Sequence, residues 1–280
     1  MNVARCQSPF GDVALSCESY TEVHWLEQSD ADVPAQNDWL SASEEIRLDG
    51  LRFAKRRADW RLGRWTAKRA VARCLNLPGD SATLARLEIR PAPDGAPEAF
   101  LAEQAAPVVI SLSHRAGHAV CAVAPAGTAL GCDLEVIEPR SAAFAADYFA
   151  PDEQALIARA PPADRERLLT LVWSAKESAL KALREGLRLD TRCVIVDLTD
   201  GPGRELENED THREDRARTL ASSVRGGGLW RPLQVCYDRG RVFRGWWQSS
   251  GELVRTVVAD PPAPSPTLLT LSHPAADIAL

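Results

Sequence analysis

The sequence predicts an α/β (α+β) protein built from two compact lobes. Its 280 residues lie near the length at which a single hydrophobic core stops growing, so two lobes are expected. Segments with strand-like alternation separate two long helical stretches. Each half of the chain shows the same coarse order of strand, helical region and strands. No sequence identity between the halves is visible, so the order of elements alone suggests a repeat.

The first half opens on a strand and continues into a helix. Residues 12–27 alternate loosely, which predicts an early strand. From Ser41 to about Cys74, apolar residues recur three and four positions apart, which predicts a helix. Ser41 or Ser43 can cap its N-terminus, and Pro78 with the following glycine ends the run.

Short strands and one further helical stretch follow. A second helical pattern runs from Pro151 to about Leu183 and is interrupted near Pro161. Short runs with apolar or alternating residues, bounded by turn residues, predict strands at 87–90, 108–113, 119–123, 129–136, 193–198, 233–237, 242–247 and 253–259. The last three strands are expected to complete an antiparallel sheet.

These elements divide the chain into three parts. We expect an N-terminal lobe at residues 1–126 and a C-terminal lobe at 127–260. The polar, Gly-rich segment at about 200–228 is expected to be an exposed or disordered insertion. Four prolines within residues 261–266 are expected to detach a Pro-rich tail, residues 261–280, from the core.

Composition excludes several classes of protein. The formal net charge of −6 disfavours a nucleic-acid partner, whose binding would depend on excess positive charge. The seven cysteines are odd in number and never spaced as CxxC, which disfavours a zinc site or a disulfide framework. No signal peptide and no apolar stretch of roughly 18 residues is present. We therefore expect a cytoplasmic protein without a membrane partner.

Two carboxylates on one predicted strand could bind a metal ion. Residues i and i+2 of a strand face the same side, so Asp133 and Glu135 should converge while Cys132 and Leu134 enter the core. Adjacent carboxylates repel each other unless a cation lies between them, and Mg²⁺ prefers oxygen ligands. The alternative is a solvated edge strand with alternating charge.

A second group lies on the predicted helix of the C-terminal half. Trp173, Glu177 and Lys181 are each four residues apart and therefore share one helix face. A tryptophan on this face implies partial burial, and a buried charge costs free energy unless it meets a partner. Only four residues of the chain are lysine, and Lys176 and Lys181 both fall here. The alternative is an ordinary surface ion pair of a helix.

Two further groups could bind phosphate oxygens. Ser113, His114 and Arg115 end a predicted strand and present donors at a turn. Four cations share one stripe of the first predicted helix: Arg57, Arg61, Arg64 and Lys68. The alternatives are a histidine held in a loop and a solvated helix face.

The order and spacing of these motifs resemble the 4′-phosphopantetheinyl transferases, in particular the long, single-chain type that activates surfactin synthetase. The GxD of Gly131-Cys132-Asp133, followed by Glu135, precedes the WxxKExxxK motif of Trp173–Lys181. The segment 110–123 is similar to the family's SxSH segment and following strand. The resemblance extends over about residues 50–200 and includes a GxP turn at 95–97 and a GR helix at 63–69.

The resemblance implies a fold and a reaction. It implies two similar lobes related by a pseudo-twofold axis, with the active site in the cleft between them, in a monomer. It also implies transfer of the 4′-phosphopantetheine arm of coenzyme A to a serine of an apo acyl or peptidyl carrier protein, with release of adenosine 3′,5′-bisphosphate. Mg²⁺ is the implied metal, with Mn²⁺ as the alternative. The implied pathways are fatty acid, polyketide or nonribosomal peptide biosynthesis.

The resemblance also implies residue roles. Asp133, Glu135 and Glu177 would bind the metal, and Glu177 could instead, or in addition, accept the serine proton. Glu177, Lys181 and His114 are the implied catalytic residues. The residues expected to bind coenzyme A are Arg57, Arg64, Lys68, Ser113, His114, Lys176 and Lys181. The first three of these would receive the 3′-phosphate, on the N-terminal lobe.

One position departs from the family pattern. The family often has a lysine within the GxP turn, where this chain has Ala96, so a phosphate contact is lost there. Arg115 is a candidate to replace it.

Two alternatives to transfer stay open. One is a catalytically silent module that binds coenzyme A or a carrier, which the presence of all three acidic residues disfavours. The other is a metal-dependent phosphodiesterase, which the net charge disfavours.

Overall fold

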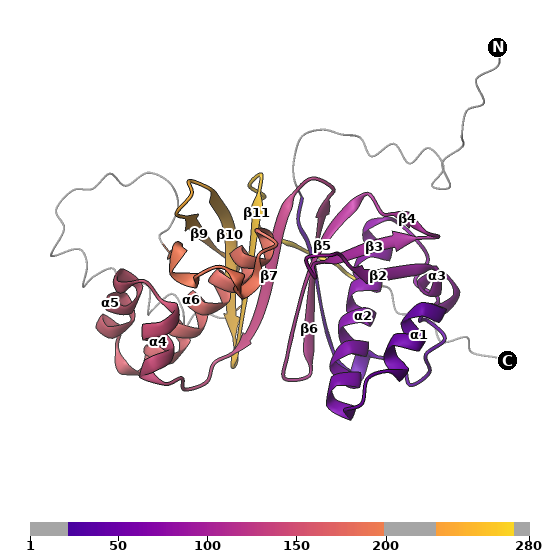
Figure 1. The fold of residues 1–280 in the computed structure, drawn as a ribbon, viewed down its shortest axis with the longest axis horizontal. Helices are drawn as coiled ribbons and strands as arrows, with labels where there is room; N and C mark the ends of the chain where they lie inside the picture. The colour runs from indigo at the N-terminus through magenta and orange to yellow at the C-terminus, as the bar shows by residue number, and fades with distance from the viewer. Residues whose placement is uncertain (1–21, 199–227, 272–280) are drawn as a thin grey trace, which may run out of the picture.

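A computed structural model describes residues 22–198 and 228–271 as a mixed α/β protein with three sheets (Figure 1). One half, on the right of Figure 1, contains the elements from β1 to β6, and the other contains β7 to β11. The strand predicted at 12–27 lies mostly outside the described residues, and the first strand observed is β1, His24–Ser29. The predicted insertion at about 200–228 also lies outside them, except for Gly228.

The helices of the described residues occupy both predicted helical regions. The α-helices are α1 Ala42–Asp49, α2 Ala54–Cys74, α3 Ser81–Arg86, α4 Ala142–Tyr148, α5 Pro151–Arg159 and α6 Pro162–Ala182. Short 3-10 helices are η1 Asp30–Asp32, η2 Gly186–Arg188 and η3 Thr191–Cys193.

The strands confirm each of the predicted segments after the first. They are β1 His24–Ser29, β2 Leu87–Pro91, β3 Pro97–Leu101, β4 Gln104–Ala105, β5 Val108–Arg115, β6 His118–Pro125, β7 Ala129–Val136, β8 Val194–Asp197, β9 Arg231–Tyr237, β10 Val242–Ser250, β11 Leu253–Asp260 and β12 Thr267–Leu268.

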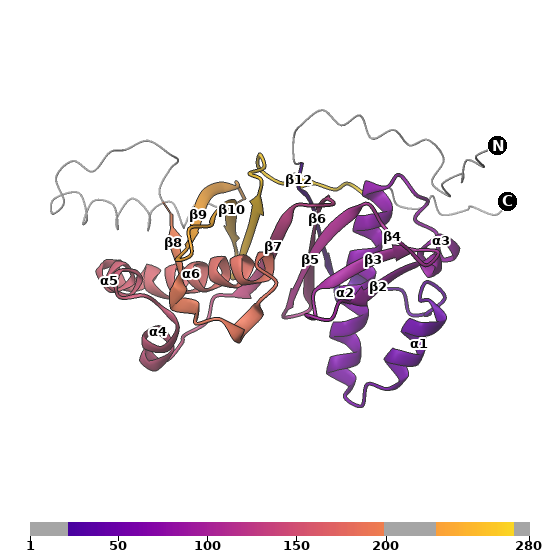
Figure 2. The same cartoon turned by 45° about the horizontal axis from the view of Figure 1, so that its top comes forward.

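Each half places one long helix on a sheet. The first sheet has the strand order β12-β1-β6-β5 and carries α2, and the second has the order β7-β11-β10-β9-β8 and carries α6. A small sheet, β2-β3-β4, completes the first half. The last three predicted strands are antiparallel neighbours, as expected. Figure 2 shows α6 lying across its sheet.

The predicted helix from Ser41 to Cys74 is two helices in the structure. Ser41 caps α1 by accepting a hydrogen bond from the backbone N–H of Glu44. Gly50 directly follows α1, and its backbone N–H donates to the carbonyl of Ile46. The guanidinium of Arg57 then donates to the carbonyls of Leu48 and Leu51, outside the intrahelical ladder. The two short helices α3 and α4 were not predicted, because so few residues show no clear periodicity.

A buried ion pair attaches α2 to its surroundings. Lys68 is fully buried on α2, and its ammonium group contacts the carboxylate of Glu44 and donates to the Trp39 carbonyl over 2.9 Å. Glu44 also accepts from the backbone N–H groups of Ser41 and Ile89. The pair therefore joins α2 to α1 and β2, and both charges are satisfied although both are buried.

The same arrangement recurs on α6. Lys176 is fully buried, with its ammonium 2.7 Å from the carboxylate of Glu153, and it also donates to the carbonyl of Thr191 over 2.9 Å. Glu153 accepts from the backbone N–H groups of Ala150 and Val196. The pair therefore joins α6 to α5 and β8.

The recurrence corresponds to a short sequence repeat. Trp65-Thr66-Ala67-Lys68 of α2 and Trp173-Ser174-Ala175-Lys176 of α6 share the pattern Trp, hydroxyl residue, Ala, Lys. The expectation that the halves show no sequence identity was therefore wrong at this tetrapeptide.

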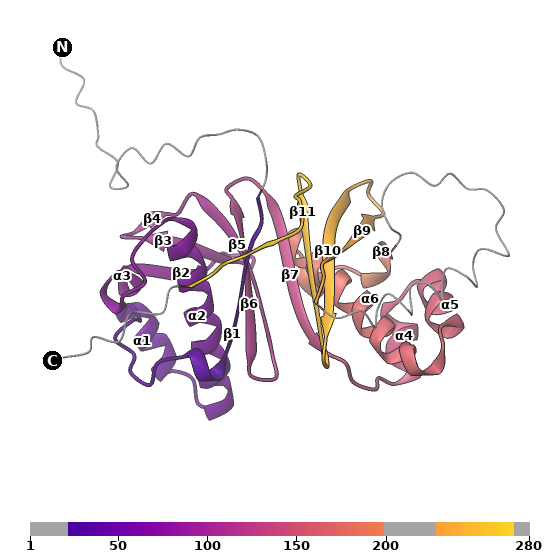
Figure 3. The same cartoon turned by 180° about the vertical axis from the view of Figure 1, so that it is seen from behind.

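A shared core joins the halves, and the C-terminal segment crosses between them. Buried apolar residues from both sheets form one cluster, which includes Trp25, Val120, Leu130 and Val257. The prediction of a detached tail is wrong for residues 267–271. Backbone ladder bonds hold β12 parallel to β1, and Leu269 and Leu271 pack on the core of the first half. Figure 3 shows this crossing. The prolines end β11, but they leave the chain free to pair again after them.

None of the helices within residues 22–198 and 228–271 is long and apolar enough to span a lipid bilayer.

Replacing Lys68 by Met should lower the free energy of unfolding by about 3 kcal/mol or more, because the buried carboxylate of Glu44 then lacks its countercharge. Urea denaturation followed by tryptophan fluorescence measures the change. Lys55→Met is the matched control on the same helix, because the Lys55 side chain is 90% exposed and its loss should cost under about 0.5 kcal/mol. Equal stability of the two variants would contradict a structural role for Lys68.

Candidate active site

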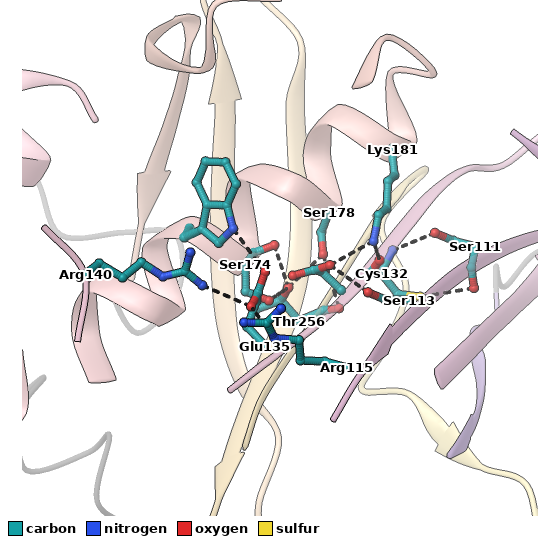
Figure 4. A network of polar contacts seen from close by, with 12 residues as sticks. Ser111, Ser113, Arg115, Cys132, Glu135, Arg140, Ser174, Ser178, Lys181 and Thr256 are labelled. Carbon is teal, nitrogen blue, oxygen red and sulfur yellow. Dashed lines mark hydrogen bonds and ion pairs between the residues drawn. The ribbon is translucent and has the colours of Figure 1, made fainter. Parts of the chain in front are cut away.

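The site lies where β7 of the second half passes β5 of the first. The hydroxyl of Ser111 accepts a hydrogen bond from the backbone N–H of Cys132, and the Cys132 thiol donates to the Ser111 carbonyl. Two residues further along β5 and one residue further along β7, the hydroxyl of Ser113 donates to Asp133 Oδ1 over 2.9 Å. Side chains therefore join the two strands, and the SxS pattern of β5 faces the GxD of β7 (Figure 4).

A glycine allows α6 to lie directly on β7. A Cβ atom added at Gly131 would lie 1.8 Å from the carbonyl oxygen of Ser178 and 2.8 Å from the nitrogen of Ala182. The hydroxyls of Ser174 and Ser178 pack against Thr256 of β11, at 2.9 and 2.7 Å from its Oγ1. Small side chains thus bring the helix backbone close to the sheet, which brings the charged residues of α6 to those of β7.

Asp133 lies at the centre of this contact. Its Oδ1 accepts hydrogen bonds from the Lys181 ammonium over 2.8 Å and from Ser113, while Oδ2 is buried and has no partner. Lys181 also donates to the Cys132 carbonyl over 2.9 Å. Burial alone would lower the pKa of Lys181, but the Asp133 carboxylate raises it above its ordinary value. Lys181 therefore stays charged beside Asp133.

Glu135 faces the same side of β7 as Asp133, as the strand period predicts, and is held by three donors. Its Oε1 accepts from the indole N–H of Trp173 over 3.1 Å. Its Oε2 accepts from Arg140 over 3.1 Å, with the Nε of Arg115 at 3.8 Å. Burial and the nearby Asp133 raise the pKa of Glu135, which the two arginines partly oppose.

Glu177 lies on α6 and interacts electrostatically with both of these carboxylates. It is one helical turn from both Trp173 and Lys181, which contact Glu135 and Asp133 respectively. Its Oε1 is buried and has no partner. Burial and the repulsion of Asp133 and Glu135 raise the pKa of Glu177 to about 7, although Lys181 opposes the rise. The carboxyl group can therefore exchange a proton near neutral pH.

The donors of this site fit a hard divalent cation. The acidic residues of the site offer oxygen ligands, and Asp133 Oδ2 and Glu177 Oε1 are both buried without a hydrogen-bond partner. Within residues 22–198 and 228–271, however, no three acidic, His or Cys side chains are already gathered around one point that could hold a metal. Both oxygens of Glu135, the third acidic residue expected to bind the metal, are engaged by Trp173 and Arg140.

An open pocket of about 360 Å³ lies next to the acidic residues. It is lined by Lys55, Asp59, His114, Arg115, Ala116, Val136 and Glu138. His114 therefore lies in the pocket, on the hairpin between β5 and β6. Burial lowers the pKa of His114, and Lys181 and Lys55 add to this while Asp59 opposes it. A neutral imidazole beside lysine and arginine can still donate one hydrogen bond to an anion.

Several residues expected to bind coenzyme A lie elsewhere. Lys68 and Lys176 are fully buried in the ion pairs described above. Arg57 donates to carbonyls after α1, and Arg64 lies over the Trp60 ring, 3.9 Å from Glu44. Of the seven expected residues, only Ser113, His114 and Lys181 come together at the site.

Three residues of the site region were missed. Arg140 follows four residues after the end of β7. Its closeness in sequence to the acidic strand could have indicated a contact with Glu135. Ser111 has the same strand parity as Ser113, and this parity places both hydroxyls on the face toward β7. Lys55 belongs to the basic cluster of the first predicted helix. The helical period does not distinguish it, as a residue that lines the pocket, from the neighbouring exposed cations.

Replacing Gly131 by Ala should destabilise the protein by at least about 2 kcal/mol, because the new methyl group overlaps the backbone of α6. Gly79→Ala is the matched control, since no atom lies within 4 Å of its added Cβ. Thermal and urea unfolding compare the two variants. A Gly131→Ala protein as stable as the control would contradict the close approach of α6 to β7.

Glu177→Gln should remove part of the pH dependence of stability in metal-free protein. The Glu177 carboxyl group has a pKa of about 7 in the folded protein and about 4.5 in the unfolded chain. The free energy of unfolding therefore falls as pH rises from 4.5 to 7, because the unfolded chain ionises more readily. This loss is up to about 3 kcal/mol. Between pH 4.5 and 8, the free energy of unfolding of the variant should therefore rise relative to that of the wild type by up to this amount. Urea denaturation with a chelator at pH 5 and pH 8 measures this. Parallel profiles for the two proteins would contradict the raised pKa.

No curated protein matches the chain. Among solved structures, one match is a holo-(acyl-carrier-protein) synthase from Bacillus anthracis in complex with CoA (3′,5′-ADP). It is 19% identical, with a TM-score of 0.32, and the match covers 38% of this chain and 97% of that one.

A family model matches part of the chain. The model is that of the 4′-phosphopantetheinyl transferase superfamily, and it matches residues 129–233. The matched residues begin at the first residue of β7 and include Asp133, Glu135, Glu177 and Lys181. Over these residues the second half of the chain is thus similar to the 4′-phosphopantetheinyl transferase superfamily, and the acidic residues of the site lie within the matched segment.

Proposed function

We propose that the protein transfers the 4′-phosphopantetheine arm of coenzyme A to a serine of an apo acyl or peptidyl carrier protein, with adenosine 3′,5′-bisphosphate as the second product. One observation carries the proposal. The open oxygens of Asp133 and Glu177 lie buried beside the Lys181 ammonium, within the residues that match the superfamily model. Such a group of charges suits a reaction in which negative charge moves between phosphate oxygens.

The reaction breaks the phosphoanhydride bond of the diphosphate and forms a phosphoester bond to the serine. The serine oxygen attacks the β-phosphorus of the diphosphate, and the bond from this phosphorus to the bridging oxygen breaks, so that the bridging oxygen leaves with adenosine 3′,5′-bisphosphate. The serine proton passes to the Glu177 carboxylate, directly or through water, and a pKa of about 7 suits this role. Metal binding and proton acceptance can be served by the two oxygens of one carboxylate.

A divalent cation would be held by Asp133 and Glu177, with Glu135 as the third ligand. Bound there, Mg²⁺ or Mn²⁺ would polarise the diphosphate and neutralise its charge. Lys181 uses two of its three N–H donors on Asp133 and Cys132, which leaves one for a phosphate oxygen.

The pocket beside the acidic residues is the proposed site for the anionic groups of coenzyme A. Lys55, His114 and Arg115 supply donors to it from the first half of the chain. Ser113 supports the site by holding Asp133. We therefore replace Lys68, Arg57 and Arg64 by Lys55 as the proposed partner of the 3′-phosphate, and we assign Lys176 a structural role.

The proposed architecture is a pair of similar lobes, residues 1–126 and 127–260, related by a pseudo-twofold axis in a monomer of the surfactin-synthetase-activating type. The buried Lys–Glu pairs on α2 and α6 support this, since each joins a long helix to a preceding short helix and to a strand. In this alignment Arg69 takes the position of Glu177. Only the second half would then carry the catalytic carboxylate.

Replacing Asp133 by Ala should reduce transfer by about 100-fold or more, since the charge that opposes Lys181 and binds the cation is removed. Intact-protein mass spectrometry of apo fatty-acid, polyketide and peptidyl carriers incubated with coenzyme A and Mg²⁺ measures transfer. The matched control is Asp152→Ala, an exposed carboxylate in the first turn of α5, which should keep wild-type activity.

Two outcomes would contradict the proposal. Full transfer by Asp133→Ala would discard the assignment of Asp133. A wild-type protein that binds coenzyme A and modifies no carrier of the panel would favour a silent binding module instead.

A further inference from the structure

Two arginines hold the third proposed metal ligand, and they come from the two halves of the chain. Arg115 lies at the end of β5, and Arg140 lies after β7. Both contact Glu135, with Arg140 Nη2 at 3.1 Å and Arg115 Nε at 3.8 Å from Oε2. Figure 4 shows both guanidinium groups directed at this carboxylate.

The same two arginines have a second carboxylate within reach. Glu138 Oε1 lies 2.6 Å from Arg115 Nη2 and 3.6 Å from Arg140 Nη2. Glu138 and Arg115 line the pocket and are each more than 40% exposed, whereas Glu135 and Arg140 are 15% and 17% exposed. The cluster therefore extends from the acidic site to the open pocket.

Arg140 has bonding capacity that the protein does not use. Its Nε is buried and has no hydrogen-bond partner. The guanidinium is stacked on the Phe144 ring, 4.7 Å from its centroid, and Phe144 packs against Trp173. A planar group with free donors, fixed by an aromatic ring, is well suited to bind a phosphate in a bidentate manner.

A metal ion and these guanidinium groups compete for one carboxylate. Glu135 cannot direct the same lone pairs at a divalent cation and at Arg140, and the cation and the guanidinium also repel each other.

We propose that Arg140, with Arg115, is a positioning residue that occupies Glu135 until an anionic diphosphate arrives, and then exchanges Glu135 for the phosphate oxygens. This inference rests on the proposed function. Glu135 is released to the metal when the arginines turn to the substrate, so metal and coenzyme A bind cooperatively. By linkage, each must raise the affinity for the other by the same factor.

The test is a double-mutant cycle on metal affinity alone, with Mn²⁺ as the probe and electron paramagnetic resonance as the readout. Without coenzyme A, Arg140→Gln should bind Mn²⁺ about 5-fold more tightly than the wild type, because the competing cation is gone. In a Glu135→Gln background the same change should have little effect. A purely long-range charge effect would persist in that background.

Three further variants complete the design. Arg241→Gln removes a guanidinium from an exposed pair with Asp260 and controls for net charge. Arg115→Gln is a second probe on an exposed side chain, with a smaller effect expected in the same direction. Asp133→Ala should abolish the bound Mn²⁺ signal. Saturating coenzyme A should then tighten Mn²⁺ binding less in Arg140→Gln than in the wild type, by about the same 5-fold factor.

The outcomes separate the two proposals. Mn²⁺ binding that requires Asp133 but is unaltered or weakened in both arginine variants overturns the inference alone. An Arg140 effect that persists without Glu135, or that Arg241→Gln reproduces, overturns it as well. Failure of the wild type to bind Mn²⁺ overturns the metal part of the proposed function, and the inference with it.

Discussion

The close packing of α6 on β7 is the contact on which the rest of the site depends. Gly131 has no side chain, so the helix backbone at Ser178 and Ala182 approaches the strand directly. Asp133 and Glu135 share the face of β7 that bears Gly131, and they contact Lys181 and Trp173, which lie about two helical turns apart on one face of α6. Gly131 belongs to the GxD motif, and its role in the structure is to allow this close packing. The geometry of the carboxylates is its consequence.

Two buried ion pairs hold the long helices in place. Lysine and glutamate are expensive to bury, and burial lowers the pKa of both Lys68 and Lys176 while their glutamates oppose this. Each glutamate is also anchored by backbone N–H groups from a short helix and a strand, so the pair specifies one position for its helix. Because Glu177 directly follows Lys176, the pair of the second half also determines where the proposed catalytic carboxylate lies. Lys176, although it lies inside the WxxKExxxK motif, thus has a structural role.

Much of the fold followed from local pattern. β7 has the bounds that alternation predicts, and the break at Pro161 separates α5 from α6 as expected. The errors have physical reasons. The spacing of apolar residues predicted one helix across Gly50, where the structure has the end of α1. The helices α3 and α4 were missed because they contain too few residues to show a helical periodicity. The prolines after β11 ended a strand without preventing β12 from pairing with β1, because pairing depends on a free edge far away in the sequence.

The sequence by itself determined which residue types share a face: the carboxylates of β7 by the period of a strand, and Trp173, Glu177 and Lys181 by the period of a helix. Such periods are local properties of the backbone. Only the tertiary structure decided which charged groups are paired with other groups of the protein. It buried Lys68 and Lys176 against glutamates, engaged Glu135 with arginines from both halves, and left Asp133 and Glu177 with open oxygens. Those partners lie far apart along the chain, and their pairing depends on burial, which no local spacing records.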